Sequence, residues 1–390
     1  MRVCILTSVH PPFDVRIFHK QAKTLRDAGY EIVLIAPHDR TETVDGIQVV
    51  GVSKPRNPLL RAVATLRLLL LALTLGADIY HFHDFELLIV GVLLRLFTGK
   101  PVIYDVHEDF PSSVYMRDWI PRVLKRPAYW LISLLETTVG WFMSAFVTAD
   151  PAVAQRFSRL GKPVVILYNF PRVADFAWLN ITADKPLERL VFVGTVSKQL
   201  GSKVMWKAMQ SVLDVTPNAT LTIIASHASL GAELSDLQDQ AATAGQSSCL
   251  RIIGPLPYQT IPEELTGYGI GWVPLQDIEK HHKNISTKMF EYMAVGIPIV
   301  GSDLPPVRRF VEDAECGILV TPSDPSAHAR AILELIHHPD EANCLGQNGR
   351  RAFLEKYHWE QQSTNLLELY RHLLNTRSGL PEDGARICAE

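Results

Sequence analysis

The chain has 390 residues, of which 47% are hydrophobic and 20% are charged, and its formal net charge is -3. This length exceeds the usual size of one hydrophobic core, and the composition excludes a disordered or fibrous chain, so two globular domains are expected. The small net charge and the absence of Lys/Arg runs exclude the electrostatic footprint of a nucleic-acid-binding protein, and no nucleic-acid partner is expected.

The charge is divided unevenly along the chain. Residues 1-168 hold 19 Lys and Arg against 15 Asp and Glu, which leaves 19 against 26 for the remainder. The basic excess of the first half suits an anionic membrane surface, and scattered solvated charges explain it equally well. The five cysteines are odd in number, widely spaced and without a CxxC pair, so a reducing cytosol is expected. The first residues, MRVCILT, read as a strand and lack the order of a signal peptide, which also favours a cytoplasmic protein.

Short apolar runs recur along the chain and are typical of strands buried on both faces. The predicted strands are 3-7, 31-36, 101-106, 163-167, 190-194, 221-225, 250-254 and 297-302. Segments with helical spacing lie between them, such as 18-28 before Gly29 and 203-215 before Pro217. This alternation predicts parallel sheets.

Two apolar stretches, 59-75 and 128-147, approach the length of a transmembrane helix. In the second, Glu136 is the only charged residue. Because 128-147 lies within the alternating strand and helix pattern, a buried or interfacial helix is favoured over a transmembrane one. The segment 119-141 also contains Arg122, Lys125 and Arg126. It fits a helix that rests on the inner leaflet and collects a lipid-linked acceptor, or a core-packing helix with a basic edge.

The pattern pauses at 169-187, which is interpreted as a linker. The predicted fold is therefore α/β, with two Rossmann-like doubly wound parallel-sheet domains facing across a cleft. The first domain is 1-168, the second is 188-359, a helix at 360-376 packs back on the first, and 377-390 is a tail.

Polar clusters follow two predicted strands of the first domain. His83 and Asp84 follow one strand, and His107 and Asp109 follow another, directly after Asp105. The carboxyl ends of parallel strands are where ligands bind. Neither cluster has a paired spacing such as HExxH, so no metal site is predicted.

The segment 284-306, NISTKMFEYMAVGIPIVGSDLPP, predicts a helix that begins at a strand's carboxyl edge. Ser286 or Thr287 is the expected N-cap, with Lys288 in the first turn and Glu291 one turn further. The helix start suits a diphosphate, and the Glu291 carboxylate suits the two hydroxyls of a ribose. The alternative is that Glu291 makes an intrahelical pair and Lys288 is solvated.

The run TKMFEYMAVGIPIVGSDLPP, with CGILVTPSDP (316-325), NGR (348-350) and YHWE (357-360), resembles the group 1 retaining glycosyltransferases of the GT-B architecture. The first half is similar to the acceptor half of the subgroup that builds bacterial surface polysaccharides, in segments 10-37, 78-88 and 102-111. The resemblance implies that Glu291 holds the donor ribose and that Ser286 to Lys288 face the diphosphate. It also implies that Gly194 and Gly201 bound a donor loop, that Gly254 lies near the base, and that His107 lies beside the reacting carbon.

This chain departs from the family pattern at three places. Thr195 and Leu200 stand where many members have phosphate-binding cations, and Lys198 or Lys203 is the expected substitute. Lys283 stands where many members have an acid, and VHPPF (9-13) replaces a double glycine.

The predicted function is a metal-independent retaining glycosyltransferase that needs no cofactor, because lysines and a helix start do the work of a cation. It would move a sugar from a UDP- or GDP-sugar to a glycan or lipid-linked acceptor in polysaccharide biosynthesis, at the inner face of the plasma membrane. The alternatives are a nucleotide-sugar epimerase of the same fold and a non-catalytic nucleotide- or glycan-binding scaffold. The predicted site residues are His107 and Asp109 for catalysis, His10, His83 and Asp84 on the acceptor side, and Gly194, Thr195, Lys198, Gly254, Ser286, Thr287, Lys288 and Glu291 for the donor.

Overall fold

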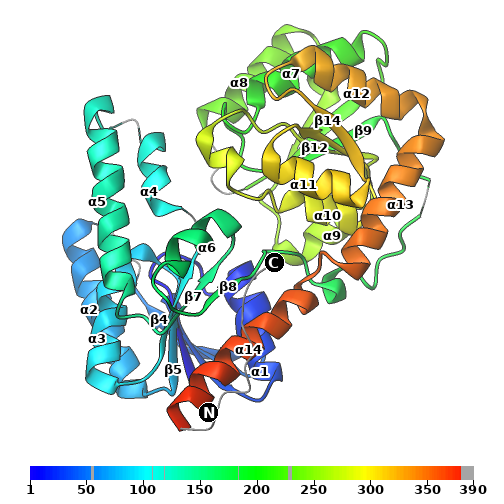
Figure 1. The fold of residues 1–390 in the computed structure, drawn as a ribbon. Coiled ribbons are helices and arrows are strands. Elements are labelled where there is room, and N and C mark those ends of the chain that lie inside the picture. The colour runs from blue at the N-terminus through cyan, green and yellow to red at the C-terminus, as the bar shows by residue number, and fades with distance from the viewer. Residues whose placement is uncertain (54–56, 108, 118, 183, 227–230, 379–390) are drawn as a thin grey trace. The chain divides into compact units, whose positions relative to one another are not determined.

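The computed structural model describes residues 1–53, 57–107, 109–117, 119–182, 184–226 and 231–378. The chain divides into two compact units (Figure 1). Unit 1 comprises Met1–Asn169 with Glu360–Glu390, and unit 2 comprises Phe170–Trp359. Each unit is a mainly parallel sheet covered by helices, so the predicted α/β fold of two Rossmann-like domains is confirmed.

Unit 1 contains an eight-stranded sheet in the order β3-β4-β2-β1-β5-β6-β7-β8. All neighbouring pairs are parallel except β3 and β4. Because the chain starts at β1, moves to β2 and β4 on one side and then crosses to β5, the winding reverses between β1 and β5. The strands are β1 (Arg2–Leu6), β2 (Glu31–Pro37), β3 (Glu42–Val44), β4 (Ile47–Val52), β5 (Ile79–Phe82), β6 (Val102–Val106), β7 (Ala145–Thr148) and β8 (Val164–Ile166).

Helices cover both faces of this sheet, with α2, α3 and α5 on one side and α1 and α14 on the other (Figure 1). In the stretch 128-147, residues up to Gly140 belong to helix α5, and residues from Ala145 onward belong to strand β7. Among the described residues, no helix has the length and hydropathy to cross a bilayer. The helices are η1 (Val15–Ala22), α1 (Lys23–Asp27), α2 (Pro58–Leu75), η2 (Phe85–Leu87), α3 (Leu88–Thr98), α4 (Phe110–Ser113), η3 (Val114–Met116), α5 (Arg122–Gly140), α6 (Pro151–Ser158) and α14 (Trp359–Ser378).

Helix α14 carries the chain back to unit 1 after unit 2 is complete. Its Tyr370 is fully buried, and the Tyr370 hydroxyl lies 2.9 Å from Nδ1 of His81 on β5. Gln362 accepts a hydrogen bond from the backbone N–H of Tyr168. The last helix is therefore part of the core of unit 1.

Unit 2 contains a six-stranded sheet in the order β11-β10-β9-β12-β13-β14, parallel throughout. Its winding reverses between β9 and β12. The strands are β9 (Arg189–Gly194), β10 (Thr220–Ala225), β11 (Leu250–Ile253), β12 (Ile270–Val273), β13 (Ile299–Ser302) and β14 (Gly317–Val320). The helices are η4 (Val173–Asp175), α7 (Ser202–Leu213), α8 (Ala232–Thr243), η6 (Ser247–Cys249), η7 (Tyr258–Thr260), α9 (Ile261–Leu265), η8 (Glu279–His282), α10 (Lys288–Ala294), α11 (Pro305–Ala314), α12 (Pro325–His337) and α13 (Pro339–Glu355).

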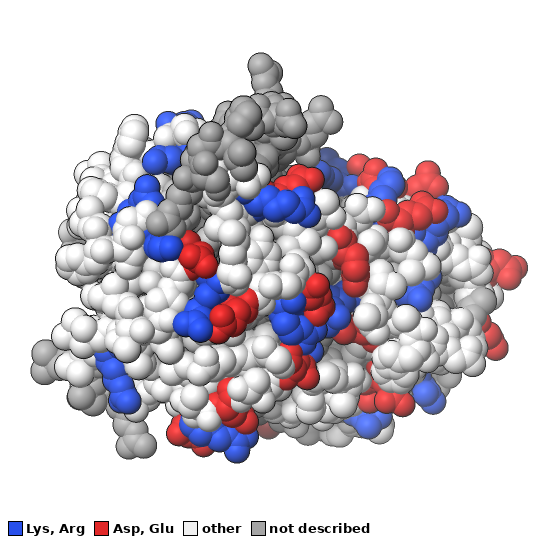
Figure 2. Space-filling view, turned by 90° about the horizontal axis from the view of Figure 1, so that it is seen from below, with Lys and Arg blue, Asp and Glu red and all other residues white. Residues whose placement is uncertain are grey.

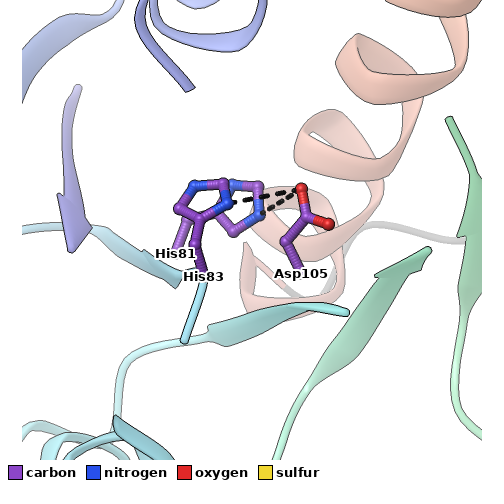
Figure 3. A group of neighbouring side chains, drawn as sticks. All are labelled: His81, His83 and Asp105. Atoms are coloured by element: carbon purple, nitrogen blue, oxygen red, sulfur yellow. Dashed lines mark ion pairs between the residues drawn. The ribbon is translucent and has the colours of Figure 1, made fainter. Parts of the chain in front are cut away.

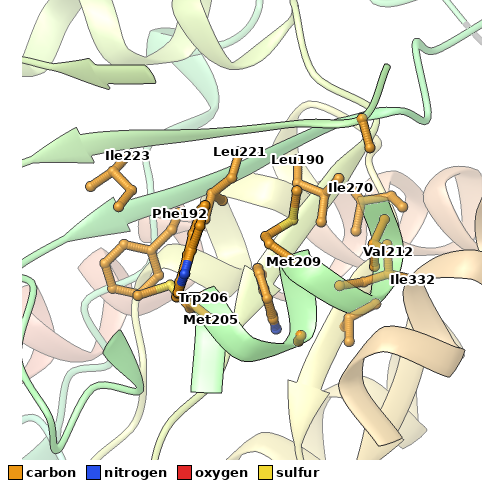
Figure 4. Packing of buried hydrophobic residues seen from close by; sticks show 14 of the residues in the cluster. Leu190, Phe192, Met205, Trp206, Met209, Val212, Leu221, Ile223, Ile270 and Ile332 are labelled. Carbon is orange, nitrogen blue, oxygen red and sulfur yellow. The ribbon is translucent and has the colours of Figure 1, made fainter. Parts of the chain in front are cut away.

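The core of unit 2 forms where helix α7 packs on strands β9 and β10 (Figure 4). Trp206 and Met209 of α7 face Phe192 and Leu221 of the sheet, and all four are buried. Burial of each such side chain stabilises the fold by about 1.5–3 kcal/mol, which fixes α7 against β9.

The segment 169-187, expected as the linker, contributes to the core of unit 2. Phe170 and Phe176 are buried, and the Phe170 ring centroid lies 4.5 Å from that of Phe290. The two phenylalanines of this segment therefore pack into unit 2, whereas Trp178 is exposed.

Candidate functional site

The carboxyl edge of the unit 2 sheet is shaped by two glycines. Strand β9 ends at Gly194, with φ +126°, and Gly201 with φ +94° precedes helix α7. A Cβ on Gly201 would lie 2.1 Å from the carbonyl oxygen of Pro274, just after β12. The loop from 195 to 201 is therefore held against the end of β12, at the point where the winding reverses and ligands bind in such sheets.

Lys288 brings a cation to this edge. A Cβ on Gly194 would lie 3.5 Å from Nζ of Lys288, and Nζ lies 3.9 Å from the ring centroid of Phe192. Burial lowers the pKa of Lys288 to about 7, and the charge of Glu291 offsets only part of this effect. Among the described residues Lys288 has no carboxylate within 4.0 Å, so an anion at this edge would supply its missing counter-charge.

Helix α10, which carries Lys288 and Glu291, has only seven residues. Thr287 occupies the N-cap position with helical φ and ψ, and its side chain makes no capping hydrogen bond. The predicted N-cap position at Thr287 is therefore confirmed, although the backbone already turns helically there and the Thr287 side chain does not cap the helix. Burial, then the charge of Asp175 and then the charge of Glu291 raise the pKa of Tyr258.

The remaining predicted donor residues lie in different settings. Thr195 Oγ1 lies 2.8 Å from Ser226 Oγ, which joins the ends of β9 and β10. A Cβ on Gly254 would lie 2.9 Å from the carbonyl oxygen of Ala225, so Gly254 also borders this edge. Lys198 is exposed, and Nζ of Lys283 lies 2.9 Å from Glu279. The structure thus brings together Gly194, Thr195, Gly254 and Lys288, while Lys198 and Lys283 point to solvent or to a surface partner.

His10 and Asp84 meet at the carboxyl edge of the unit 1 sheet, where β1 and β5 end. Nδ1 of His10 lies 2.9 Å from Asp84 Oδ1, and Asp84 Oδ2 accepts hydrogen bonds from Thr7, Ser8 and Val9. Burial lowers the pKa of His10, but the hydrogen bond and charge of Asp84 outweigh it and raise the pKa overall. Burial opposes ionisation of Asp84, yet His10 and Ser8 lower its pKa to about 2.

Asp105 on β6 is fully buried and holds a network of partners. Arg16 donates to both of its oxygens, at 3.1 and 3.0 Å, and Gln21 donates to Oδ2 at 2.6 Å. Burial raises the pKa of Asp105, but Arg16 and then the neighbouring histidines lower it well below its usual range. Because both oxygens are engaged, Asp105 does not act as a base toward a substrate. Arg16 and Gln21 were missed from the sequence.

His83 and His107 form a pair beside Asp105, with Nδ1 of His83 2.8 Å from Nε2 of His107. Burial lowers the pKa of His107 to about 4, and the charge of Asp105 only partly opposes this effect. His107 is therefore neutral at pH 7. Its ring lies 4.8 Å from that of His10, so the predicted acceptor-side residues His10, His83 and Asp84 are neighbours of His107.

Asp109 lies at the start of helix α4. It accepts a hydrogen bond from Ser112, and its Oδ1 is 3.9 Å from Arg156. These contacts stabilise the start of α4.

His81, His83 and Asp105 are close enough to hold a metal ion (Figure 3). Nε2 of His81 and Nε2 of His83 are buried without a hydrogen-bond partner among the described residues. However, Asp105 already receives Arg16, whose positive charge opposes a bound cation. The donor set fits a structural ion pair better than a metal centre.

Two doubly wound sheets of this strand order, each with polar groups at the reversal of its winding, define a GT-B protein. Residues 180–352 match the family described as "Glycosyl transferases group 1", and residues 15–169 match the "Glycosyl transferase 4-like domain". The chain therefore carries a glycosyltransferase 4-like domain followed by a group 1 glycosyltransferase domain.

Curated relatives are distant in sequence. The chain is 26% identical to a D-inositol 3-phosphate glycosyltransferase of Streptosporangium roseum, over 75% of this chain and 69% of the relative. It is 22% identical to a phosphatidyl-myo-inositol mannosyltransferase of Mycolicibacterium smegmatis, over 90% of this chain and 87% of the relative. A D-inositol 3-phosphate glycosyltransferase of Corynebacterium jeikeium is 28% identical, and the chain spans less than half of that relative, 43%.

Solved structures share the fold. Sucrose-phosphate synthase from Thermosynechococcus elongatus matches with a TM-score of 0.75 and 16% identity, over 96% of this chain and 99% of that one. Anabaena HepE in complex with UDP-glucose matches with a TM-score of 0.69 and 14% identity, over 97% of this chain and 100% of that one.

The geometry at His10 makes a direct prediction. Since Asp84 raises the pKa of His10, Asp84→Asn should lower that pKa, measured by NMR titration of ¹³C-labelled histidine with His10→Gln for assignment. Asp277→Asn, which removes the exposed carboxylate beside His282, is the control and should leave His10 unchanged. An unaltered His10 titration in Asp84→Asn would contradict the pairing.

Proposed function

We propose that this protein is a retaining glycosyltransferase that moves a sugar from a UDP- or GDP-sugar to a glycan or lipid-linked acceptor in polysaccharide biosynthesis. The observation that carries the donor assignment is Lys288, a partly buried cation set against Gly194 at the edge of the unit 2 sheet. Complexes of Anabaena HepE, a structure of the same fold, contain UDP and UDP-glucose, which supports a nucleotide-sugar donor.

Sugar transfer leaves negative charge on the departing diphosphate while positive charge grows on the anomeric carbon. A cation placed beforehand at the leaving group stabilises that transition state without reorganisation. In this proposal Lys288 stabilises the diphosphate, Thr195 and the backbone at Gly194 border it, and Glu291 accepts hydrogen bonds from the ribose. Retention of the anomeric configuration is implied by the family resemblance, and independence of metal ions follows from the proposed role of Lys288 at the leaving group.

The acceptor is assigned to unit 1. His10 and Asp84 lie at the reversal of the unit 1 sheet, and His107 lies beside them. Because His107 is neutral at pH 7, it adds no positive charge that would oppose an oxocarbenium-like carbon placed beside it. Asp109 is the catalytic residue proposed to take the proton of the acceptor hydroxyl. We place the enzyme at the inner face of the plasma membrane, where a lipid-linked acceptor is held.

Replacing Lys288 tests the donor site. Lys288→Met should weaken UDP or GDP binding by about 1.5–3 kcal/mol, because a charge-assisted hydrogen bond is lost. A bound diphosphate raises the pKa of Lys288 above about 7, so wild-type affinity should fall as the pH rises above 7, and Lys288→Met should lose this dependence. Isothermal titration calorimetry with UDP and GDP across pH measures both effects and names the base.

Lys207→Met, at an exposed position on helix α7, is the matched control and should bind nucleotide as the wild type does. Equal dissociation constants for Lys288→Met and wild type would reject the donor site. Nucleotide binding without any transfer to glycan or lipid-linked acceptors would favour the scaffold.

His107→Ala should lower kcat by on the order of 10²-fold through lost positioning, and should leave the dissociation constant of UDP unchanged. Transfer of radiolabelled sugar and calorimetry measure the two quantities. His338→Ala, on the surface of unit 2, is the control. A collapse of donor affinity in His107→Ala would contradict its place beside the reacting carbon.

Removal of metal ions tests the last part of the proposal. Because Lys288 is expected to neutralise the leaving group, transfer should continue at an unchanged rate in excess EDTA. A rate that disappears in EDTA and returns with Mg²⁺ or Mn²⁺ would show that a metal ion does this work.

A further inference from the structure

Exposed apolar side chains gather on one part of unit 1. Of the 22 large hydrophobic residues that are exposed among the described residues, 16 lie on helices α2, α3 and α5 or in the segments that flank α5, so their distribution is not random. They are Val63, Leu66, Leu70, Ile89, Leu96, Phe97, Tyr115, Trp119, Val123, Leu124, Trp130, Leu131, Leu134, Leu135, Trp141 and Phe142. We call this set the helical face.

The three helices of the helical face are neighbours. Helix α3 contacts both α2 and α5, and all three lie on the same side of the unit 1 sheet (Figure 1). Val63, Leu66 and Leu70 follow each other at helical spacing on the outer side of α2, while Leu68, Leu69 and Ala72 point into the core. The outer residues are therefore turned away from the sheet that the inner residues cover.

Helix α5 shows the imbalance most clearly. Of its 19 residues only Glu136 and Gly140 are buried, although the helix contains two aromatic residues and eight aliphatic Leu, Ile, Val or Ala residues. A surface helix of a globular protein normally turns its apolar side to the core. Contiguous apolar surface rimmed by polar residues marks a binding surface, so helix α5 is expected to meet an apolar partner.

The charged side chains that helices α2, α3 and α5 expose to solvent are all basic. Helices α2, α3 and α5 contain six basic residues and a single acid, Glu136. Glu136 is fully buried, where it accepts a hydrogen bond from Tyr104 and pairs with Arg156 at 2.7 Å. The left margin of the view in Figure 2 shows white and blue side chains, while red ones appear further in. The basic residues are Arg61, Arg67, Arg95, Arg122, Lys125 and Arg126.

We infer that the helical face docks on a bilayer that contains anionic lipids. Aromatic and aliphatic side chains enter the interface between headgroups and acyl chains, and the cations meet lipid phosphates. A second copy of this chain fits less well, because two identical faces would bring like charges together. The inference names the partner of the proposed enzyme, and it does not depend on the donor or on the transfer step.

The orientation on the bilayer follows from the helices themselves. In this inference the helical face lies on one leaflet, with its apolar side chains in the interface. Trp130 is 61% exposed and Arg126 lies one turn before it, so the ring and the guanidinium reach the interface together.

Vesicle flotation tests this inference with the full chain. Wild-type protein should bind vesicles of phosphatidylcholine with phosphatidylglycerol at least tenfold more strongly than vesicles of phosphatidylcholine alone. The double variant Arg122→Gln with Arg126→Gln should lose roughly tenfold or more of the binding to anionic vesicles. The double variant Trp130→Ser with Leu134→Ser should lose binding to both kinds of vesicle.

Matched controls lie in unit 2. Trp178 is 59% exposed, nearly the same as Trp130, so Trp178→Ser should bind vesicles as the wild type does. Lys207→Gln with Arg330→Gln removes two exposed cations elsewhere and should also leave binding unchanged. All substituted side chains are exposed, and thermal unfolding checks that each variant is folded.

Three results would overturn the inference. The first is no binding of wild type to either vesicle, and the second is binding that the helical-face variants leave unchanged. The third is a wild-type dimer that Trp130→Ser with Leu134→Ser converts to monomer, without vesicle binding. UDP titration of the same samples separates this outcome from failure of the proposed function, because the donor residues lie in unit 2.

Discussion

A charged carboxylate with no access to water organises unit 1. Isolation of such a charge costs several kcal/mol unless opposite charge and hydrogen bonds surround it. Asp105 meets this requirement through Arg16 and Gln21, and Arg16 also donates to the carbonyl oxygen of Leu167 after β8. The requirement therefore ties helix η1 to strands β6 and β8, and it fixes the histidines beside which an acceptor is proposed to bind. Removal of Arg16 would leave the buried Asp105 carboxylate without its fully charged partner.

The sequence predicted the architecture because long apolar runs are a local signal. Runs such as 3-7, 31-36 and 221-225 became strands, and their alternation with helices indicated parallel sheets. The predicted strands did not include β3, β4, β12 and β14. Strands β12 and β14 have only four residues each, and β3 and β4 lie in segment 42-52, where polar residues and glycines interrupt the apolar run. The helix at 18-28 begins earlier, as η1, because Asp14 accepts hydrogen bonds from the N–H groups of Arg16 and Ile17.

The site could be predicted only in outline, because its decisive contacts join residues far apart in sequence. The position of Lys288 against Gly194 depends on packing between α10 and β9, which no spacing rule reports. The link from Asp105 to Arg16 spans 89 residues, and that from His81 to Tyr370 spans 289. Thr195 did look unusual in the sequence, but its contact with Ser226 needed the register of β9 and β10.

The path of the chain has a consequence for how the protein is made. Unit 1 needs helix α14, whose Tyr370 fills the space beside His81, yet the ribosome releases α14 only after the whole of unit 2. Domains fold as they emerge, so unit 2 is able to reach its native state while unit 1 still lacks its last element. Until helix α14 is synthesised, unit 1 therefore remains incomplete, and His81 lacks the Tyr370 side chain that later covers it.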